Sequence, residues 1–377
     1  MFQVMFQHSL IAFLIIGLSN ATCISSSQCS PVSFLVSASA NNILFPSFLG
    51  TSNASVIAEF LYSSLANGYT SQETKQVDGV FAVNGTYCRP LVVNRHQHIL
   101  QLLVHGVTYD SSMWSGFGYS STYDWQLFAS RQGYPTLAVD RLGHGINANY
   151  PDPFEIVQGP LQVELLHSLI ELLKGGNSRV GQVDGLVYVG HSYGSSLGNN
   201  LAERYPEDVD AYILTGFSSN VTISSNDIAY YESAATVDDR FKSLPLGYLT
   251  VSTEKARTAS FYGGLFDESL AQYDYSREDS VTVGEFLSPG LRPVATTYTR
   301  NVLVLNGDRD SLFCAGSPSD CAQILNKTGQ DLFPQAAYEY LVISNTGHCL
   351  TLHRSAPQTF ATAHDWLRHV ELPSLMK

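Results

Sequence analysis

The segment GLVYVGHSYGS, residues 185–195, constrains the fold more than any other part of the chain. Residues 186–189 form an apolar run that is typical of a strand buried on both faces. The run stops at Gly190, and a segment with helical character follows Gly194. A strand that turns directly into a helix needs glycines where the two elements come close, because side chains there would collide. We therefore expect a strand–turn–helix unit whose turn presents Ser192.

Apolar runs of strand length recur along the chain, and segments of helical periodicity separate them. We expect strands at residues 98–104, 135–140, 185–190, 211–216, 301–306 and 338–344, and helices at residues 161–174, 195–204 and 357–370. Because strands and helices alternate, the pattern predicts an α/β fold with a mostly parallel, doubly wound sheet and right-handed crossovers.

Three stretches depart from this alternation. Residues 76–97 alternate polar and apolar side chains around Asn84-Gly85, which predicts an antiparallel hairpin at one edge of the sheet. Residues 218–299 are polar and rich in tyrosine, and they separate two parts of the core, residues 76–217 and 300–377. An insertion there would lie over the carboxyl ends of the strands, so we interpret it as a lid rather than a structural excursion. Residues 22–75 are an N-terminal extension that we expect to brace the sheet edge.

Composition and charge exclude several classes of protein. The chain has 377 residues, of which 44% are hydrophobic and 14% are charged, as in a globular domain with a large core. Its net charge is −13, from 33 acidic and 20 basic residues, and it shows no cluster of lysine and arginine. We therefore expect no nucleic-acid partner.

The N-terminus points to export. Residues 1–21, MFQVMFQHSLIAFLIIGLSNA, hold an apolar stretch at 10–18 followed by the small residues Ser19 and Ala21 around Asn20. The stretch is shorter than the roughly 18 to 20 apolar residues that a membrane span needs. This pattern predicts a cleaved signal peptide and a secreted protein without a stable membrane anchor, although its first eight residues lack Lys and Arg. An uncleaved anchor is the alternative.

Cysteines and glycosylation sequons agree with secretion. Six cysteines, an even number, suggest disulfides, and the segment CAGSPSDC makes Cys314–Cys321 the best candidate pair. Possible N-glycosylation sites are Asn53, Asn84, Asn220 and Asn326. We expect no metal, because no C-x-x-C or H-x-x-x-H spacing occurs. We also expect no cofactor, and we interpret Gly143-His144-Gly145 as a tight turn and not as a phosphate loop, because no Walker lysine follows it.

Five short motifs occur in a fixed order along the chain. They are HGV (105–107), DRLGHG (140–145), GHSYG (190–194), NGDRD (306–310) and TGH (346–348). Through these motifs, residues 76–372 resemble the α/β-hydrolase superfamily, and more narrowly its secreted, fungal-type serine hydrolases. GHSYG fits the nucleophile elbow G-x-S-x-G of that fold, with Gly190 and Gly194 as the elbow glycines.

The resemblance implies a Ser-Asp-His triad. Ser192 is the expected nucleophile, and an alcohol needs an adjacent base to react at neutral pH. The family carries its catalytic histidine in the loop after the last strand, which selects His348. The competing histidines are His191, which flanks the serine, and His353, which lies closer to the following helix.

The acid and the oxyanion hole are also expected by resemblance. Two aspartates follow the strand at 301–306, and the family's G-x-x-D spacing selects Asp310 over Asp308. The backbone N–H groups of Tyr193 and Val107 are the expected oxyanion donors, with Thr108 as a possible extra hydroxyl donor. Asp140 and Arg141, at the end of another strand, are expected to be structural.

These residues predict a serine hydrolase that cleaves a carboxylic ester or lactone through an acyl-enzyme. The lid tyrosines suggest an aromatic-lined pocket for a small, moderately apolar substrate. Other triad chemistry, such as C–C bond hydrolysis or hydroxynitrile lyase activity, is the first alternative. A non-catalytic binding protein on the same fold is the second.

Overall fold

The computed structural model describes residues 28–69, 71, 73–145, 149–176, 179–221, 230–288, 292–314 and 318–372. The expected signal peptide, residues 1–21, and Cys23 lie outside these residues.

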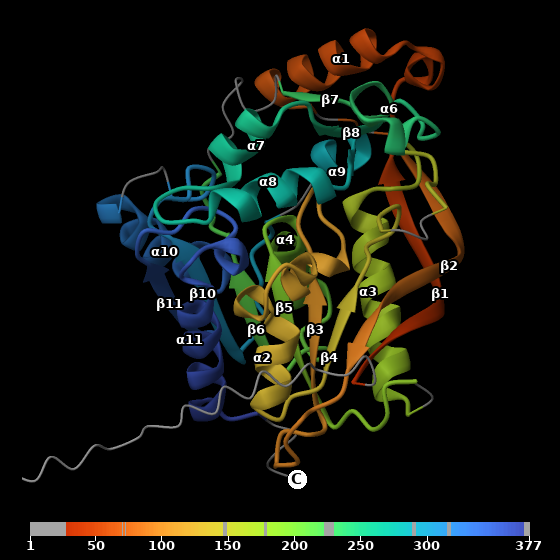
Figure 1. Cartoon of the computed structure of the whole chain (residues 1–377). Coiled ribbons are helices and arrows are strands. Elements are labelled where there is room, and N and C mark those ends of the chain that lie inside the picture. Colours follow the sequence, from red (N-terminus) through yellow and green to blue (C-terminus); the bar gives the residue numbers. More distant parts are fainter. Residues whose placement is uncertain are drawn as a thin grey trace, which may run out of the picture.

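The centre of the molecule is an eight-stranded sheet of order β1-β2-β4-β3-β5-β6-β10-β11 (Figure 1). Its strands are β1 (Cys29–Ile43), β2 (Thr74–Cys88), β3 (Ile99–Val104), β4 (Thr136–Val139), β5 (Gly185–His191), β6 (Ala211–Thr215), β10 (Asn301–Gly307) and β11 (Ala337–Ile343). The strands from β4 to β11 are parallel, and β1 and β2 are antiparallel to their neighbours. All six expected core strands are present.

Helices cover both faces of this sheet. They are α2 (Trp125–Arg131), α3 (Gly159–Lys174), α4 (Tyr193–Arg204), α10 (Pro318–Leu332) and α11 (Ala356–His369). Successive residues of β3 point to opposite faces, so Leu102 packs in the core under α3 and α4 and Leu103 in the core under α2 and α11. Every residue of β3, β4, β5 and β6 is buried, as their continuous apolar runs predict.

The expected hairpin at Asn84-Gly85 is wrong. Asn84 and Gly85 lie inside β2, which pairs with β1 along its whole length and with β4 near its end. A Cβ on Gly85 would lie 2.3 Å from the carbonyl oxygen of Ala138 in β4. The glycine therefore serves a close approach between two strands and not a turn.

The N-terminal extension has two parts. As expected, β1 braces the sheet edge, and the Cys29–Cys88 disulfide ties its first residue to the last residue of β2. Helix α1 (Ala54–Asn67) is capped by Asn53, whose side chain accepts from Val56 N–H. It packs against a separate layer through Ile57 and Leu61, which the sequence did not predict.

That layer, which we call the cap, comprises residues 230–288. It contains a three-stranded antiparallel sheet of β7 (Tyr231–Ser233), β8 (Tyr248–Val251) and β9 (Val281–Thr282), with helices α6 (Ala234–Val237), α7 (Glu254–Phe261), α8 (Glu268–Arg277) and α9 (Val283–Leu287). Figure 1 shows it above the carboxyl ends of the core strands, with α1 on top. Short 3-10 helices complete the described structure: η1 (Ser47–Thr51), η2 (Ser111–Gly118), η3 (Ser121–Tyr123), η4 (Asp239–Phe241) and η5 (Leu350–Leu352).

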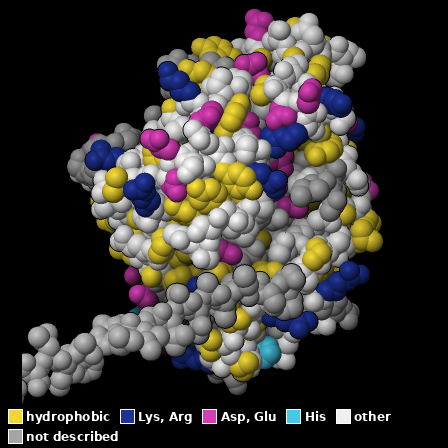
Figure 2. Space-filling view, in the orientation of Figure 1, with side chains coloured by type: hydrophobic (Ala, Val, Ile, Leu, Met, Phe, Trp, Pro, Cys, Tyr) yellow, Lys and Arg dark blue, Asp and Glu magenta, His cyan; other side chains and the backbone are white. Residues whose placement is uncertain are grey.

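The charged side chains of one face and the lengths of the helices are two further features of the structure. Figure 2 shows acidic and basic side chains scattered in small groups across one face of the molecule. Within the described ranges, no helix is long and apolar enough to cross a bilayer.

Candidate active site

Ser192 occupies the sharp turn between β5 and α4. Its φ of 53° and ψ of −114° are rare for a residue with a side chain, and such strain costs about 1–3 kcal/mol. A Cβ on Gly190 would lie 2.7 Å from Ser195 Cα, and one on Gly194 would lie 2.2 Å from the carbonyl oxygen of Val104. Only glycine fits at both positions, so the sequence of the turn fixes the position of Ser192.

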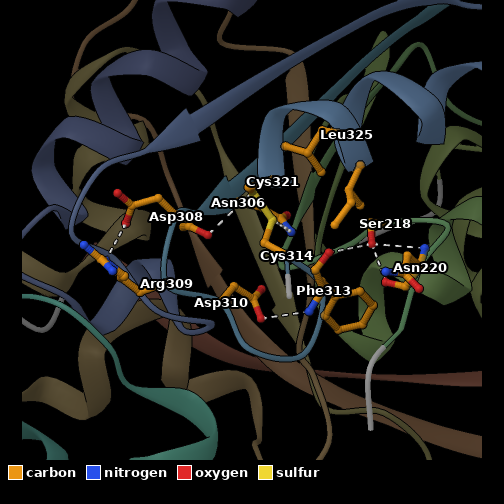
Figure 3. Close-up of a disulfide and its surroundings, with 12 residues drawn as sticks. Ser218, Asn220, Asn306, Asp308, Arg309, Asp310, Phe313, Cys314, Cys321 and Leu325 are labelled. Atoms are coloured by element: carbon orange, nitrogen blue, oxygen red, sulfur yellow. Dashed lines mark hydrogen bonds and ion pairs between the residues drawn. A yellow bond between two sulfur atoms is a disulfide. The ribbon is translucent and has the colours of Figure 1, made fainter. Parts of the chain in front are cut away.

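His348 and Asp310 form a buried hydrogen-bonded pair. Asp310 follows β10, His348 lies in the loop after β11, and His348 Nδ1 is 2.9 Å from Asp310 Oδ2. The other oxygen, Asp310 Oδ1, accepts the backbone N–H groups of Leu312 at 2.9 Å and Phe313 at 3.1 Å. These bonds orient the carboxylate toward the imidazole. The Cys314–Cys321 disulfide closes the same loop (Figure 3).

The neighbouring aspartate serves the loop itself. Asp308 Oδ1 accepts the backbone N–H of Thr346 at 3.2 Å and lies 3.8 Å from Arg309 Nε. Figure 3 shows Asp308 and Arg309 pointing away from Asp310. Of the two aspartates that the sequence left in competition, the structure therefore places Asp310 against His348.

Ser192 lines a cavity whose wall includes two aromatic neighbours of His348. The His348 ring lies between Phe313 and Phe261, with centroid distances of 5.4 Å and 5.7 Å, and both phenylalanines line the cavity together with Ser192. No hydrogen bond joins Ser192 Oγ to His348 Nε2 in the described part of the chain. Such contacts are often long in the absence of substrate and shorten in the reacting complex.

The two competing histidines have other partners. His191 Nδ1 is 3.1 Å from Thr215 Oγ1, and burial lowers its pKa well below the ordinary value. His353 Nε2 accepts the N–H of Gly347 at 3.0 Å, and its Nδ1 donates to the carbonyl of Cys349 at 2.7 Å. Burial lowers the pKa of His353 to about 4. A neutral His353 therefore holds the loop that carries His348.

Cys349 is buried and forms no disulfide with any described residue. Its Sγ lies 2.9 Å from the Tyr109 hydroxyl and 3.7 Å from His191 Nε2, and burial raises the thiol pKa. It is a small core residue beside His348.

Arg141 fixes the backbone of the loop that carries Val107. Arg141 Nε donates to the His105 carbonyl at 3.1 Å, and Nη2 donates to the Gly106 carbonyl at 3.0 Å. In a trans peptide the N–H points opposite to the preceding carbonyl, so the Val107 N–H faces away from Arg141. Tyr193 begins α4, and its N–H has no intrahelical acceptor. Neither N–H has an acceptor among the described residues.

Arg141 belongs to a buried charge cluster that joins core and cap. Its Nη1 contacts Glu285 of α9 and donates to Gln162 Oε1 at 2.8 Å, while His144 Nε2 lies 3.0 Å from Glu285. Burial opposes the charge on Glu285, but Arg141 and His144 hold its pKa well below the ordinary value. The sequence predicted a structural Arg141 and did not reveal its acidic partner.

A second cluster anchors the cap beside Thr108. Arg257 of α7 bonds Asp274 at 2.8 Å and Glu278 at 3.1 Å, and its Nη1 donates to Thr108 Oγ1 at 2.9 Å. The Thr108 hydroxyl, a possible extra oxyanion donor by sequence, is thus engaged by the cap. Burial raises the pKa of Glu278 to about 7.

The cavity above Ser192 has a volume of about 230 Å³. This is below the roughly 300–1,000 Å³ of pockets for drug-sized ligands. Its lining is mostly apolar and comes from α1, the cap and the core loops, including Leu65, Val107, Phe261, Phe286, Leu312 and Phe313. The expected wall of lid tyrosines is largely wrong. Tyr231 lines the cavity, but Tyr248 and Tyr262 pack within the protein, and phenylalanines supply most of the aromatic surface.

Sequence reasoning missed Leu65, Glu285 and Arg292 of this cavity. They come from three distant segments, and no motif marks any of them. Within the described ranges, no group of three or more His, Cys, Asp or Glu side chains could hold a metal ion.

Comparison with known proteins defines the class. A sequence model described as the alpha/beta hydrolase family matches residues 101–363, more than half of the chain. The chain therefore belongs to the alpha/beta hydrolase family, and its fold is the α/β-hydrolase fold with antiparallel strands at the N-terminal edge.

Similar solved structures share this fold at low identity. They include a thermophilic esterase from Thermogutta terrifontis, with 16% identity, a TM-score of 0.50 and coverage of 76% of this chain and 94% of that chain. The carboxylesterase CesB from Bacillus subtilis has 16% identity, a TM-score of 0.51 and coverage of 83% and 98%. Rv0554 from Mycobacterium tuberculosis has 15% identity, a TM-score of 0.51 and coverage of 78% and 96%. A search of curated proteins finds no match.

Proposed function

We propose that this protein is a serine hydrolase that cleaves a carboxylic ester or lactone of a small, moderately apolar substrate. The observation that carries the proposal is the buried Asp310–His348 pair, 2.9 Å apart, beside a strained serine turn that opens into an apolar cavity. The three residues come from the ends of β5, β10 and β11, which meet at one edge of the parallel sheet.

In the proposed reaction Ser192 Oγ attacks the carbonyl carbon and His348 Nε2 takes its proton. Asp310 accepts from Nδ1, which keeps Nε2 free to act as the base and stabilises the imidazolium that forms. The carbon–oxygen bond to the leaving group then breaks, and His348 returns the proton to the departing alcohol. Water attacks the resulting acyl-enzyme by the same steps and releases the acid.

The negative charge on the tetrahedral intermediate needs donors that are already in place. We assign this role to the backbone N–H groups of Val107 and Tyr193, because both residues line the cavity with Ser192 and neither N–H has another acceptor in the described structure. Arg141 acts as a positioning residue, since it holds the Gly106 carbonyl on the opposite side of the peptide.

Fluorophosphonate labelling tests this proposal. We expect the wild-type protein to be labelled and to hydrolyse short 4-nitrophenyl esters, and we expect Ser192→Ala to lose both activities by several orders of magnitude. Ser196→Ala is the matched control, because Ser196 lines the same cavity one helical turn away. A folded wild-type protein that neither labels nor cleaves esters would favour a binding protein. Ester cleavage that survives in Ser192→Ala would exclude the serine mechanism.

We also propose that the protein is exported, as the fungal-type secreted enzymes that it resembles are. The disulfides Cys29–Cys88 and Cys314–Cys321 support this, since disulfides persist in oxidising compartments. Of the four sequons, Asn53, Asn220 and Asn326 are exposed, whereas Asn84 lies in β2 between two strands. Expression in a secretory host should give a processed protein with glycans at exposed sites. Retention inside the cell would contradict export.

A further inference from the structure

One arginine in the wall of the cavity has no acidic partner among the residues that the structure describes. Arg292 lines the cavity together with Ser192 and is partly withdrawn from solvent. No hydrogen bond or ion pair to Arg292 occurs within the described residues. Its surroundings in the cavity are largely apolar, with Phe286 and Phe313 among the lining side chains.

The other arginines that are withdrawn from solvent are all paired. Arg141 contacts Glu285, Arg257 contacts both Asp274 and Glu278, and Arg300 contacts both Glu207 and Asp210. Among the described residues, a carboxylate thus accompanies each guanidinium that is withdrawn from water, except that of Arg292.

Removing a guanidinium partly from water without pairing it costs free energy, unless a bound ligand supplies the opposite charge. Burial lowers the pKa of Arg292, and no carboxylate of the described residues counters this shift. The acidic side chain in the same wall, Glu285, is already engaged by Arg141, His144 and Gln162. The missing counter-charge is therefore left for a bound molecule.

We propose that Arg292 binds a free carboxylate on the substrate while the ester or lactone carbonyl lies at Ser192. The substrate class is then a small carboxylate-bearing ester or lactone, an inference that rests on the proposed function. A guanidinium can hold a carboxylate with two parallel hydrogen bonds. One arginine, beside Glu285 and in a protein of net charge −13, suits a single negative charge better than a doubly charged phosphate.

The bound carboxylate takes no part in bond making. Ser192 forms the acyl–oxygen bond, the alcohol leaves with a proton, and water yields the acid, as in the uncharged case. Arg292 therefore contributes binding and orientation. Its removal should affect charged substrates selectively.

Two matched substrate pairs test this assignment. The first compares 4-nitrophenyl hydrogen glutarate with 4-nitrophenyl pentanoate, which places the carboxylate on the acyl side. The second compares 4-acetoxybenzoate with its methyl ester, which places the carboxylate on the leaving group. We expect wild-type kcat/KM to favour the carboxylate in at least one pair, and Arg292→Met to lower that value by about 10- to 100-fold while leaving the uncharged partner within about twofold.

Control variants separate the effect of the Arg292 charge from the effects of its shape and of impaired folding. Arg292→Lys should keep part of the preference, because it keeps the charge but loses the planar fork. Arg309→Met is the matched control, because Arg309 is an exposed arginine next to Asp310 that does not line the cavity. It should leave the preference unchanged. Arg292→Lys and Arg309→Met should retain the wild-type thermal unfolding midpoint.

Binding measurements test the role of Arg292 without requiring the protein to turn over a substrate. Calorimetry with benzoate, benzamide and phenyl phosphate should show the tightest binding for benzoate, with a loss in Arg292→Met. Equal affinities for benzoate and benzamide, or no effect of Arg292→Met on either binding or selectivity, would overturn the proposal even if uncharged esters are cleaved. Tighter binding of phenyl phosphate would overturn the carboxylate assignment. Benzoate binding without any ester cleavage would retain the anion site and reject the proposed hydrolase.

Discussion

Replacing Arg141 with lysine separates the charge of this side chain from its geometry. Lysine retains one positive charge for Glu285 but lacks the planar fork with which Arg141 Nε and Nη2 donate to the carbonyls of His105 and Gly106 at 3.1 Å and 3.0 Å. We therefore expect the Gly106–Val107 peptide to lose its fixed orientation while the buried ion pair survives.

The expected loss of kcat follows from the misplaced Val107 N–H, which is one of the two proposed oxyanion donors. Complete loss of one oxyanion-hole donor costs about 10²–10³ in kcat. A peptide that is loosened rather than removed should cost less, so we expect kcat to fall roughly 10- to 100-fold, with KM changed by less than about threefold. Removing the charge as well, as in Arg141→Met, would leave the buried Glu285 with only His144 beside it, and breaking such a buried ion pair costs about 3–5 kcal/mol of stability.

Steady-state kinetics on a short, uncharged 4-nitrophenyl ester gives both constants, and circular dichroism reports folding. Arg300→Lys is the control, because Arg300 also pairs with acidic residues and donates to the Val209 carbonyl, but its bonds within the described residues do not reach the loop that carries Val107. A kcat within twofold of wild type in Arg141→Lys would refute the positioning role. A matching loss in Arg300→Lys would show a general effect of weakened ion pairs.

Three further predictions concern the triad, the turn and acid stability. Asp310→Asn should lower kcat by roughly 10³–10⁴-fold and Asp308→Asn by less than about tenfold, so the reverse order in ester kinetics would exchange their roles. Gly194→Ala should destabilise the fold by about 3 kcal/mol or more in urea unfolding, because its Cβ would lie 2.2 Å from a carbonyl oxygen. Burial lowers the pKa of His353 and His364 from 6.5 to about 4. These histidines take up protons on unfolding, so each should contribute a loss of about 2 kcal/mol of stability between pH 7 and pH 5, whereas Glu278, with its pKa raised to about 7, releases a proton on unfolding and contributes a gain of about 2 kcal/mol. Urea unfolding of His364→Gln at both pH values should therefore show about 2 kcal/mol less loss of stability than the wild type, and an unchanged pH dependence would contradict this.

Much of the core could be predicted from the sequence, because the apolar runs that mark its strands lie within short stretches of the chain. The apolar runs that became β3, β5 and β6 are continuous, and strands buried on both faces require such runs. The turn at Ser192 could be predicted because its glycines meet backbone atoms of adjacent elements, which is a property of the strand–helix unit itself.

The errors have a common physical origin. Asn84-Gly85 carries the local signature of a hairpin turn, but the pairing of β2 with β1 and β4 overrides it. Tyrosine content suggested an aromatic pocket, yet burial placed Tyr248 and Tyr262 inside the protein. In both cases a tertiary contact decided the outcome, and one sequence shows no tertiary contacts.

The residues that line the cavity could not be predicted from the sequence for the same reason. Leu65 reaches the cavity only because α1 packs on the cap, and Arg141 meets Glu285 across 144 positions of sequence. Arg292 has no motif around it. The role that we propose for it rests on the lack of an acidic partner among the described residues, which only the arrangement of the surrounding side chains reveals.

The most direct test of the central claim is the site and amount of acyl-enzyme formed in the first turnover. Rapid mixing with a 4-nitrophenyl ester, followed by acid quench and peptide mapping, measures both. We expect a burst of about one equivalent of 4-nitrophenolate and an acyl group on the peptide that contains Ser192. An acyl group on another residue, or undiminished turnover in Ser192→Ala, would contradict the proposed mechanism.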